Sequence, residues 1–555
     1  MNKRILALAI ALLMACSSLA FADGEAGIAP ILGFGGEWAS GSWGVSQLPL
    51  SDGDPIHVSC MFPRQSGHPI SLDDTWWAKE LLKRANVVID WTLVEKAGFQ
   101  DKKNLVLASG DYPDIFMDGI TKVDEQTYGP QGVFVNLAPL IEEYAPNTCE
   151  LFKMYPDVKK SLSYPDGAIY NMCDFNITPR DQFCSAPYYN KAWVENLGMK
   201  QPTTLEELYD VLLAVKEKDA DGDGDPTNEI PLLYPDGSCN NFKTAVLAGY
   251  GLMALVDDQG VMADFVKDGA YLFVPVQEGY RDYLTYMNRL YTAGIITDNN
   301  FTYTGEQVNA KIADVDVFMM EGAPYGNIVD DEDWIDSYDM LPFLSSERSS
   351  EKIWPATLRH TRAWGNFVMT DACKYPVEMV KLQDYFYTDV GSMMVRAGRE
   401  RYTYDEYGWE ITVDEATGDW TAAIYYDKDN FNGYYAWRLY NSPLQGTYVA
   451  GEFQNKVMIC TDYKNNWYSN TKMNTGRSDY MQIPYPEVTF TQDEQDTLMV
   501  YVDIANYVNS MEAKFIRGEV SIEDGWDSYV DTIENMGLQD IIDVKQAAYD
   551  RWNLN

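Results

Sequence analysis

Apolar and polar residues follow two different periods along the chain, and together they predict strands that alternate with helices. Residues 56–62 alternate as a half-buried strand does, residues 76–85 have the spacing of an amphipathic helix, and residues 87–94 return to a strand. A helix over residues 102–109 and a short strand over residues 114–117 follow. Strands that alternate with helices form a parallel sheet, which binds ligands at the carboxyl ends of its strands. The pattern therefore predicts an α/β fold.

An acidic loop directly after a predicted helix is the most informative local pattern. Overlapping capping boxes over residues 203–207 mark the start of that helix. Asp219, Asp221 and Asp223 then occupy alternate positions of a D-x-D-x-D-G sequence. EF-hand loops use this spacing to place side-chain oxygens around calcium.

The acidic loop departs from an EF-hand at its end. Ile230 occupies the twelfth position, where an EF-hand has a bidentate Glu, and Glu229 comes one residue early. Residues 231–234 predict a buried strand in place of an exiting helix. Because clustered like charges are unfavourable without a cation, the loop is predicted to bind a structural Ca²⁺, with a solvated acidic turn as the alternative. The predicted ligands are Asp219, Asp221, Asp223, Asp225, Asn228 and Glu229.

The N-terminus has the features of an export signal. Basic residues precede an apolar run over residues 5–15, which is too short for a permanent transmembrane helix. Two processing sites overlap: the sequence LMAC resembles a bacterial lipobox that would leave a lipidated Cys16, and AFA at residues 20–22 is an ordinary cleavage site. The lipobox is favoured. Residues 1–22 are therefore predicted to be a signal peptide, and the Gly- and Ser-rich residues 23–54 a flexible tether, in a protein that is exported to the cell surface, the periplasm or the exterior.

Composition narrows the range of partners. The 42 Lys and Arg against 84 Asp and Glu give a net charge of -42, which would repel nucleic acid and anionic membrane. The 15 Trp and 39 Tyr suit a cleft that stacks sugar rings, although any single aromatic is more often a core residue. With 3 His and no G-x-S-x-G or H-E-x-x-H sequence, a hydrolase triad or histidine metal site has little to be built from.

The cysteines do not indicate a disulfide framework. They show no C-x-x-C spacing, and their number apart from Cys16 is odd, so their pairing stays open. These residues are Cys60, Cys149, Cys173, Cys184, Cys239, Cys373 and Cys460.

Several segments along the chain share one resemblance. They include KNLVLASGDYPDI at residues 103–115, DGAIY at 166–170 and YNKAWVENLG at 189–198, followed by the capped helix and its acidic loop. The closing segments KFIRG, WDSYV and AAYDRW come in the same order. Over about 450 residues these segments together resemble extracellular solute-binding proteins of carbohydrate ABC importers, in the branch of oligosaccharide- and alginate-binding proteins and LipO-like lipoproteins.

The resemblance implies a periplasmic-binding-protein-like fold with two discontinuous lobes, a hinge and an interlobe ligand cleft. By analogy, lobe 1 comprises residues 55–170 and 362–400, and lobe 2 comprises residues 171–361 and 401–555, including the calcium loop at 219–229. The implied function is the substrate-binding component of an ABC importer, not an enzyme. It would bind an oligosaccharide as a monomer, close about the hinge and deliver the sugar to the transmembrane permease subunits, with a lipid anchor as its one membrane contact.

The predicted sugar contacts combine aromatic rings with hydrogen-bond acceptors, because rings stack on sugar C–H faces and carboxylates accept from hydroxyls. Tyr325 follows from the family's Gly-x-aromatic turn. Glu400 follows from its G-x-E-G loop, where Arg401 replaces the usual glycine. The full predicted set is Trp76, Trp77, Asp118, Tyr325, Trp364, Glu400 and Trp437.

Two other functions fit the same features. A secreted glycoside hydrolase would also be acidic, aromatic-rich and stabilised by calcium, and it needs only two facing carboxylates. A sugar-binding surface protein without transport would have the same pocket chemistry. The missing catalytic signature and the length of the resemblance favour the importer component, while the identity of the sugar stays open.

Overall fold

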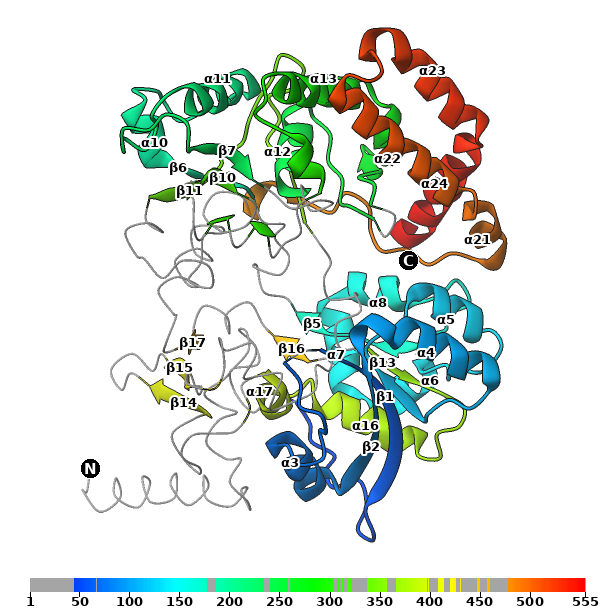
Figure 1. The fold of residues 1–555 in the computed structure, drawn as a ribbon. Helices are drawn as coiled ribbons and strands as arrows, with labels where there is room; N and C mark the ends of the chain where they lie inside the picture. The colour runs from blue at the N-terminus through cyan, green and yellow to red at the C-terminus, as the bar shows by residue number, and fades with distance from the viewer. Residues whose placement is uncertain are drawn as a thin grey trace, which may run out of the picture. The chain divides into compact units, whose positions relative to one another are not determined.

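The chain folds into two compact units, each with helices around its own sheet (Figure 1). The computed structural model describes residues 44–65, 67–176, 186–233, 240–257, 260–302, 307–308, 311–312, 317–320, 337–356, 366–396, 398, 408–413, 420–425, 430, 447–449, 457–459 and 478–554. Unit 1 comprises Met1–Met154, Tyr170–Thr178 and Arg362–Cys460. Unit 2 comprises Tyr155–Ile169, Pro179–Thr361 and Thr461–Asn555.

Unit 1 is built on a five-stranded sheet in the order β2-β1-β3-β13-β4. In the centre, β1 (Ile56–Arg64) pairs in parallel with β2 (Val87–Glu95) and with β3 (Ile115–Met117). β13 (Phe367–Met369) is antiparallel to β3 and to β4 (Asn171–Met172). The predicted β-α-β arrangement is confirmed, and the carboxyl ends of β1, β2 and β3 lie at one edge of the sheet.

Local sequence sets the helices between these strands. α3 (Trp76–Ala85) begins after Thr75, whose side chain accepts from the Ala78 N–H. α4 (Lys96–Ser109) ends at Gly110 in the left-handed conformation but begins earlier than predicted. Its first turn contains Gly98, a poor helix former, so the sequence pattern did not predict a helix before residue 102. The remaining helices of unit 1 are α5 (Lys122–Tyr128), α6 (Ala138–Tyr144), α7 (Pro146–Met154), α16 (Pro376–Tyr385) and α17 (Asp389–Arg396).

The start of unit 1 corrects the predicted tether, because residues 44–54 are attached to the body. The Val45 N–H donates to Asn147 Oδ1 at 2.8 Å, and the Leu50 N–H donates to the Ala85 carbonyl at 3.0 Å. A sequence rich in Gly and Ser predicted flexibility, but hydrogen bonds to distant helices fix this segment.

The division of the chain also differs from the predicted lobes. Residues 155–169, predicted in lobe 1, belong to unit 2, whereas residues 171–178 and 401–460, predicted in lobe 2, belong to unit 1. Strand pairing explains both transfers to unit 1: β4 belongs to the five-stranded sheet, and β16 (Tyr448–Val449) pairs in parallel with β5 (Phe175–Asn176), which follows β4 directly. Pairing between strands this far apart in the chain cannot be predicted from local sequence. A further sheet of unit 1 contains β14 (Gly408–Val413), β15 (Trp420–Tyr425) and β17 (Val457–Ile459).

Unit 2 is built on a four-stranded sheet in the order β11-β6-β10-β7. Its strands are β11 (Tyr338–Met340), β6 (Tyr188–Asn190), β10 (Val317–Met320) and β7 (Ile230–Leu233). Before β7 comes α11 (Leu205–Glu217), which starts at the predicted capping box: Thr204 accepts from the Glu207 N–H, and Glu207 accepts from the Thr204 N–H. α11 packs its apolar stripe, Leu208, Leu212 and Val215, into the core of the unit.

Unit 2 also contains two-stranded sheets, β8 (Asp264–Lys267) with β9 (Ala270–Phe273) and β12 (Trp354–Pro355) with β18 (Met481–Gln482), and further helices, including those at the C-terminus. Among the helices that the structure describes, none combines the length and apolar character that crossing a membrane requires. The further helices are α8 (Pro156–Leu162), α10 (Lys191–Asn196), α12 (Asn240–Gly249), α13 (Glu278–Thr292), α21 (Gln492–Leu498), α22 (Tyr501–Arg517), α23 (Ile522–Asn535) and α24 (Leu538–Leu554).

Candidate functional site

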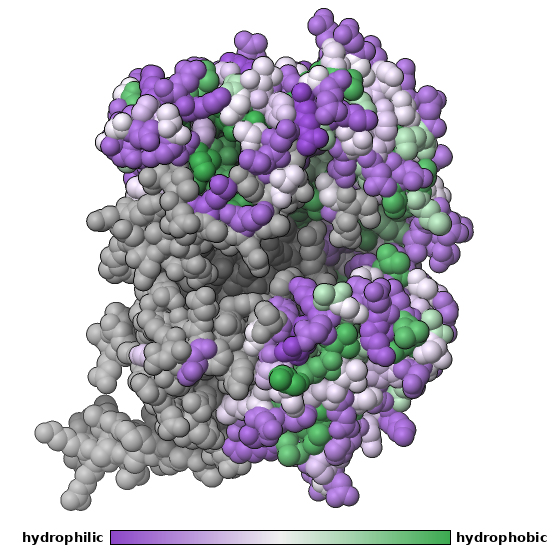
Figure 2. Space-filling model, in the orientation of Figure 1, coloured by the Kyte–Doolittle hydropathy of each residue, from purple (hydrophilic) through white to green (hydrophobic). Residues whose placement is uncertain are grey.

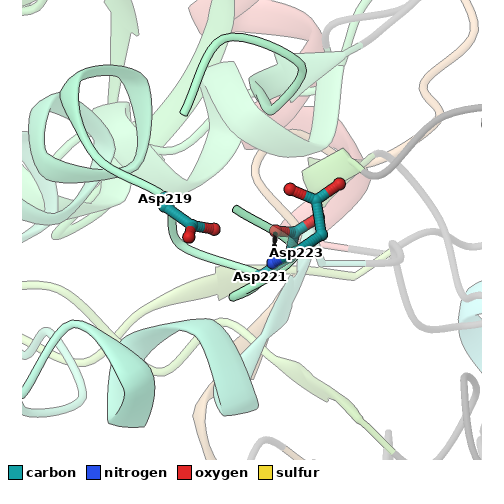
Figure 3. A group of neighbouring side chains, drawn as sticks. All are labelled: Asp219, Asp221 and Asp223. Carbon is teal, nitrogen blue, oxygen red and sulfur yellow. Dashed lines mark hydrogen bonds between the residues drawn. The ribbon is translucent and has the colours of Figure 1, made fainter. Parts of the chain in front are cut away.

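The acidic loop of unit 2, residues 219–229, connects the end of α11 to the start of β7. Asp219, Asp221 and Asp223 each offer a carboxylate oxygen, and these oxygens lie within 4.8 Å of one another (Figure 3). The alternate spacing in the sequence therefore brings the three side chains together, as predicted. Oxygen atoms gathered at this separation suit a hard cation such as Ca²⁺, which takes six to eight oxygen ligands.

Hydrogen bonds from the loop's own backbone hold the aspartates. Asp219 Oδ1 accepts from the Gly222 N–H at 2.8 Å, and Asp219 Oδ2 accepts from the Gly224 N–H at 3.1 Å. Both glycines have positive φ, at +85° and +97°, so the tight turn requires residues without a side chain at these two positions. The loop is thus shaped by residues close to one another in sequence.

The end of the loop contributes two buried oxygen atoms without a hydrogen-bond partner among the described residues. The Asn228 amide donates to Asp223 Oδ2 at 2.8 Å, and Glu229 Oε1 accepts from the Ala220 N–H at 2.7 Å. Asn228 Oδ1 and Glu229 Oε2 remain unsatisfied. A buried oxygen without a partner destabilises the fold, whereas a bound cation would satisfy it. The residues present therefore fit a calcium ion.

Asp225 is predicted to offer the ion its backbone carbonyl, and its carboxylate is used within the loop. Its Oδ1 accepts from the Thr227 N–H at 3.1 Å and from the Thr227 hydroxyl at 2.6 Å. Its side chain is not one of the three that converge.

In unit 1, Asp118 lies directly after β3, at the carboxyl end of this parallel strand. Its φ of 68° is in the left-handed region, and Gly119 follows with φ +88°. Asp118 Oδ1 accepts from the Gly119 N–H at 2.7 Å. Burial raises the pKa of the Asp118 carboxyl to about 6, and this hydrogen bond and the Lys96 charge offset the effect only in part. A half-buried carboxylate at a strand end is an acceptor suited to ligand hydroxyls.

The two tryptophans of α3 differ in their surroundings. Trp77 is fully buried, and its ring stacks on Phe386 with centroids 5.9 Å apart. The prediction that Trp77 contacts the ligand is corrected, because the ring is a core residue without an exposed face. Trp76 is half-buried at the first position of the helix, and its buried Nε1 has no hydrogen-bond partner among the described residues.

The other predicted contacts cannot be located in the same way. Tyr325, Trp364, Glu400, Trp437 and the lipidation candidate Cys16 lie outside the described residues.

Sequence reasoning missed the polar network that supports the Asp118 loop, residues 118–121. Buried Lys103 of α4 forms an ion pair with Asp124 of α5 and donates to Gln100 Oε1 at 2.6 Å. Asp124 Oδ2 accepts from the Thr121 N–H at 2.7 Å. Asn366, just before β13, donates through its amide to the Ile120 carbonyl at 2.8 Å. The lysine within the apolar pattern of α4 was the one available signal of a buried partner.

The hydrophilic surface of the described residues is consistent with the many charged residues of the sequence. In the view of Figure 2, the described residues at the surface are mostly hydrophilic, with apolar ones scattered among them. Isolated apolar residues such as Ile70, which is 90% exposed, are normal on a protein surface.

Comparison with known proteins gives relatives with one common role. A scan against protein-family models finds no match. The chain is 26% identical over 500 residues to the fructooligosaccharide ABC transporter substrate-binding protein FusA of Streptococcus pneumoniae, a match that covers 86% of this chain and 87% of FusA. It is 29% identical over 262 residues to the polygalacturonan/rhamnogalacturonan-binding protein YtcQ of Bacillus subtilis, covering 45% of this chain and 46% of YtcQ. It is 27% identical over 231 residues to lipoprotein LipO of the same species, covering 39% and 40%.

Solved structures show the same fold at low sequence identity. FusA of S. pneumoniae in complex with kestose matches with a TM-score of 0.71 and 23% identity over 90% of this chain and 100% of FusA. A solute-binding protein from Bifidobacterium longum infantis, described as binding HMO, matches with a TM-score of 0.76 and 19% identity over 90% of this chain and 99% of that protein. The alginate-binding protein AlgQ2 matches with a TM-score of 0.66 and 19% identity, over 91% of this chain and 100% of AlgQ2.

These matches establish the fold of the chain and its homology to known proteins. The fold is that of two-domain solute-binding proteins, as the resemblance implied. Because the match to FusA spans most of both chains, the relationship is not confined to one unit. The chain is thus a homologue of the solute-binding proteins of carbohydrate ABC transporters, which confirms the resemblance seen in its sequence.

Proposed function

We propose that this protein is the extracellular substrate-binding component of an ABC importer and that its ligand is an oligosaccharide. The observation that carries the proposal is the match to FusA, a fructooligosaccharide-binding transport protein, over 86% of this chain. In such a protein the ligand is bound and released unchanged to the transmembrane permease subunits, and hinge closure about the ligand reports that the site is filled.

The ligand is proposed to be a neutral oligosaccharide. Asp118, after β3, would accept hydrogen bonds from sugar hydroxyls, and the half-buried Trp76, at the start of the helix that follows β1, would offer an aromatic ring. A net charge of -42 and a carboxylate in the site both disfavour uronic acids, although YtcQ and AlgQ2 bind acidic polysaccharides. Tyr325, Trp364, Glu400 and Trp437 are retained as proposed contacts from the family resemblance.

Binding without turnover separates this proposal from a glycoside hydrolase. A hydrolase needs two carboxyl groups on opposite sides of the scissile bond, one of which must be held protonated. Asp118 has a raised pKa, but the relatives are transport proteins, so we assign it hydrogen bonding and no proton transfer.

The acidic loop of unit 2 is proposed to hold one structural Ca²⁺. Asp219, Asp221, Asp223, Asn228 and Glu229 would bind the ion, which supplies positive charge to a loop that is otherwise a cluster of like charges. One solved structure of FusA is described as an EF-hand mutant and one of AlgQ2 as without calcium ion, and both descriptions support the proposal of a calcium site.

Attachment to the membrane is proposed to occur through a lipid on Cys16, in line with the lipoprotein LipO among the relatives. The body would then act as a monomer at the cell surface.

A ligand screen tests the proposed function. Neutral oligosaccharides should raise the apparent melting temperature of the purified protein, because a ligand that binds only the native state stabilises it, whereas matched oligouronates should not. A stabilising sugar should be recovered intact by chromatography. Stabilisation by none of the neutral sugars, or release of new reducing ends, would contradict the proposal.

A further inference from the structure

The Asp118 loop is built so that its carboxylate has one orientation. Asp118 and Gly119 both have positive φ, and a Cβ added to Gly119 would lie 2.2 Å from the Phe99 ring. The loop therefore packs closely on α4. A non-glycine residue in the left-handed region is uncommon, and such conformations gather at functional sites.

Asn366 holds this loop twice. Its backbone carbonyl accepts from the Asp118 N–H at 2.8 Å, and its side-chain Nδ2 donates to the Ile120 carbonyl at 2.8 Å. Asn366 is 5% exposed, and its Oδ1 has no hydrogen-bond partner among the described residues. An amide, unlike a carboxylate, can donate to a carbonyl, so the residue type is suited to this role.

Only one of the two oxygens of the Asp118 carboxylate accepts a hydrogen bond from the described residues. Oδ1 is bonded to the Gly119 N–H, while none of the described residues donates a hydrogen bond to Oδ2. The burial that raises the pKa of this group is unfavourable for stability and outweighs the favourable interactions with the Gly119 N–H and the Lys96 charge. An oxygen held in place with lone pairs unused is an acceptor for hydroxyl groups of a ligand.

We propose that Asn366 is a positioning residue, which fixes the backbone of the Asp118 loop so that Asp118 Oδ2 accepts hydrogen bonds from sugar hydroxyls. The inference rests on the proposed function and deepens it: the subsite in unit 1 selects a sugar with free hydroxyl donors and excludes a carboxylate at the same position. Preorganisation is the reason for the effect, since a loop that is already ordered loses less conformational entropy on binding.

Substitution of Asn366 by Leu tests the inference, because Leu has a similar volume and no donor. The matched control is Thr370→Val, at the opposite end of β13. It removes a partly buried hydrogen bond of 2.6 Å to the Pro113 carbonyl, which lies just before β3. By titration calorimetry with the best oligosaccharide, N366L should bind about 10- to 100-fold more weakly, and T370V should bind like the wild type.

A double-mutant cycle separates positioning from a general loss of stability. In the Asp118→Asn background, N366L should weaken binding by less than about twofold further, because the carboxylate that it positions is gone. Full additivity, or wild-type affinity in N366L, would overturn the inference. If N366L does not fold, Asn366→Asp, which is nearly isosteric but lacks the donor, takes its place.

Amide hydrogen exchange gives a readout that does not depend on sugar. N366L should accelerate exchange at residues 118–121, and T370V should not. Unchanged exchange in N366L would refute the positioning role even if sugars bind. Binding of no sugar by the wild type, with exchange altered as expected, would instead count against the proposed function and leave the positioning of the loop supported.

Discussion

The acidic loop of unit 2 and the Asp118 loop of unit 1 are stabilised by different kinds of contact: the first by residues close in sequence, the second by a distant residue. In the acidic loop, the hydrogen bond that closes the loop joins Ala220 and Glu229, only nine residues apart. In the Asp118 loop, the side chain that holds Ile120 is Asn366, 246 residues away. The first loop gathers several carboxylates, where we propose that a cation binds, and the second holds a single carboxylate, which we propose as a ligand acceptor. Local spacing can therefore bring carboxylates together, whereas the position of Asp118 depends on the assembled sheet.

Removal of calcium should have the largest effect of the changes considered. A calcium ion held at about 100 to 1,000 times its dissociation constant contributes about 3 to 4 kcal/mol, so excess EDTA should lower the apparent stability of the protein by that amount. Calorimetry with EDTA, and with calcium restored as control, measures it. Because the loop is local, exchange at residues 118–121 should stay unchanged. An unaltered melting temperature, with no metal found by elemental analysis, would contradict the site.

Asp118→Asn should separate binding from stability. The substitution removes a charged acceptor and should weaken oligosaccharide binding by about 1.5 to 3 kcal/mol. Stability should rise, by up to about 3 kcal/mol at neutral pH, because the native state no longer holds a carboxylate whose pKa burial raises. Titration calorimetry and thermal unfolding measure the two quantities. Wild-type affinity in this variant would remove Asp118 from the site.

The sequence predicted what short-range rules determine. The capping box of Thr204 and Glu207 and the convergence of Asp219, Asp221 and Asp223 depend on neighbours within one turn or loop, and both are confirmed. The parallel order of β1, β2 and β3 followed from alternating periods and the preference of such units for a parallel sheet.

Features that depend on residues distant in sequence were not predicted. Residues 44–54 read as a tether, but Asn147 and Asn86 bind their backbone. Trp77 read as a ligand contact, but Phe386, from another segment of unit 1, covers its ring. Nothing near Asn366 in the sequence indicates that its amide reaches the loop after β3. Each case requires the tertiary fold, which a local pattern does not contain.

Acidic pH should affect the Asp118 loop through protonation. The pKa of Asp118 is about 6 in the folded protein against an ordinary value of 3.8, so the group takes up a proton as the pH falls through about 6. The neutral acid has fewer acceptor lone pairs, and oligosaccharide affinity should therefore decline below pH 6 and level off above it. Protonation also relieves the unfavourable burial of charge, so the contribution of Asp118 to stability improves over the same range.

The control for this pH effect is Asp118→Asn, because burial also raises the pKa of Asp384 to about 6. Asp384 accepts from Asn147 and Thr148 inside unit 1 and would shift the stability profile of both proteins alike. Calorimetric titrations at intervals between about pH 5 and pH 8 should show a decline in wild-type affinity and a flat profile in the variant. Parallel profiles would contradict the assignment to Asp118.

Gln100→Ala should have the smallest effect. Gln100 donates to the Gly119 carbonyl at 3.2 Å and accepts from Lys103 Nζ at 2.6 Å. Because Gln100 is exposed, water can replace both hydrogen bonds, and Lys103 keeps its ion pair with Asp124. Oligosaccharide affinity should fall by about 0.5 kcal/mol, well below the loss expected for Asn366→Leu. An equal or larger loss in Gln100→Ala, by titration calorimetry, would show that the buried partner is not what fixes the loop.

The central claim is that the protein binds an oligosaccharide and does not transform it. Titration calorimetry of the wild-type protein against a panel of neutral oligosaccharides, followed by chromatography of the recovered sugar, tests it most directly. We expect saturable binding to a single site for at least one member, with the sugar recovered at its original length. No saturable heat with any member, or the appearance of shorter products, would contradict the account.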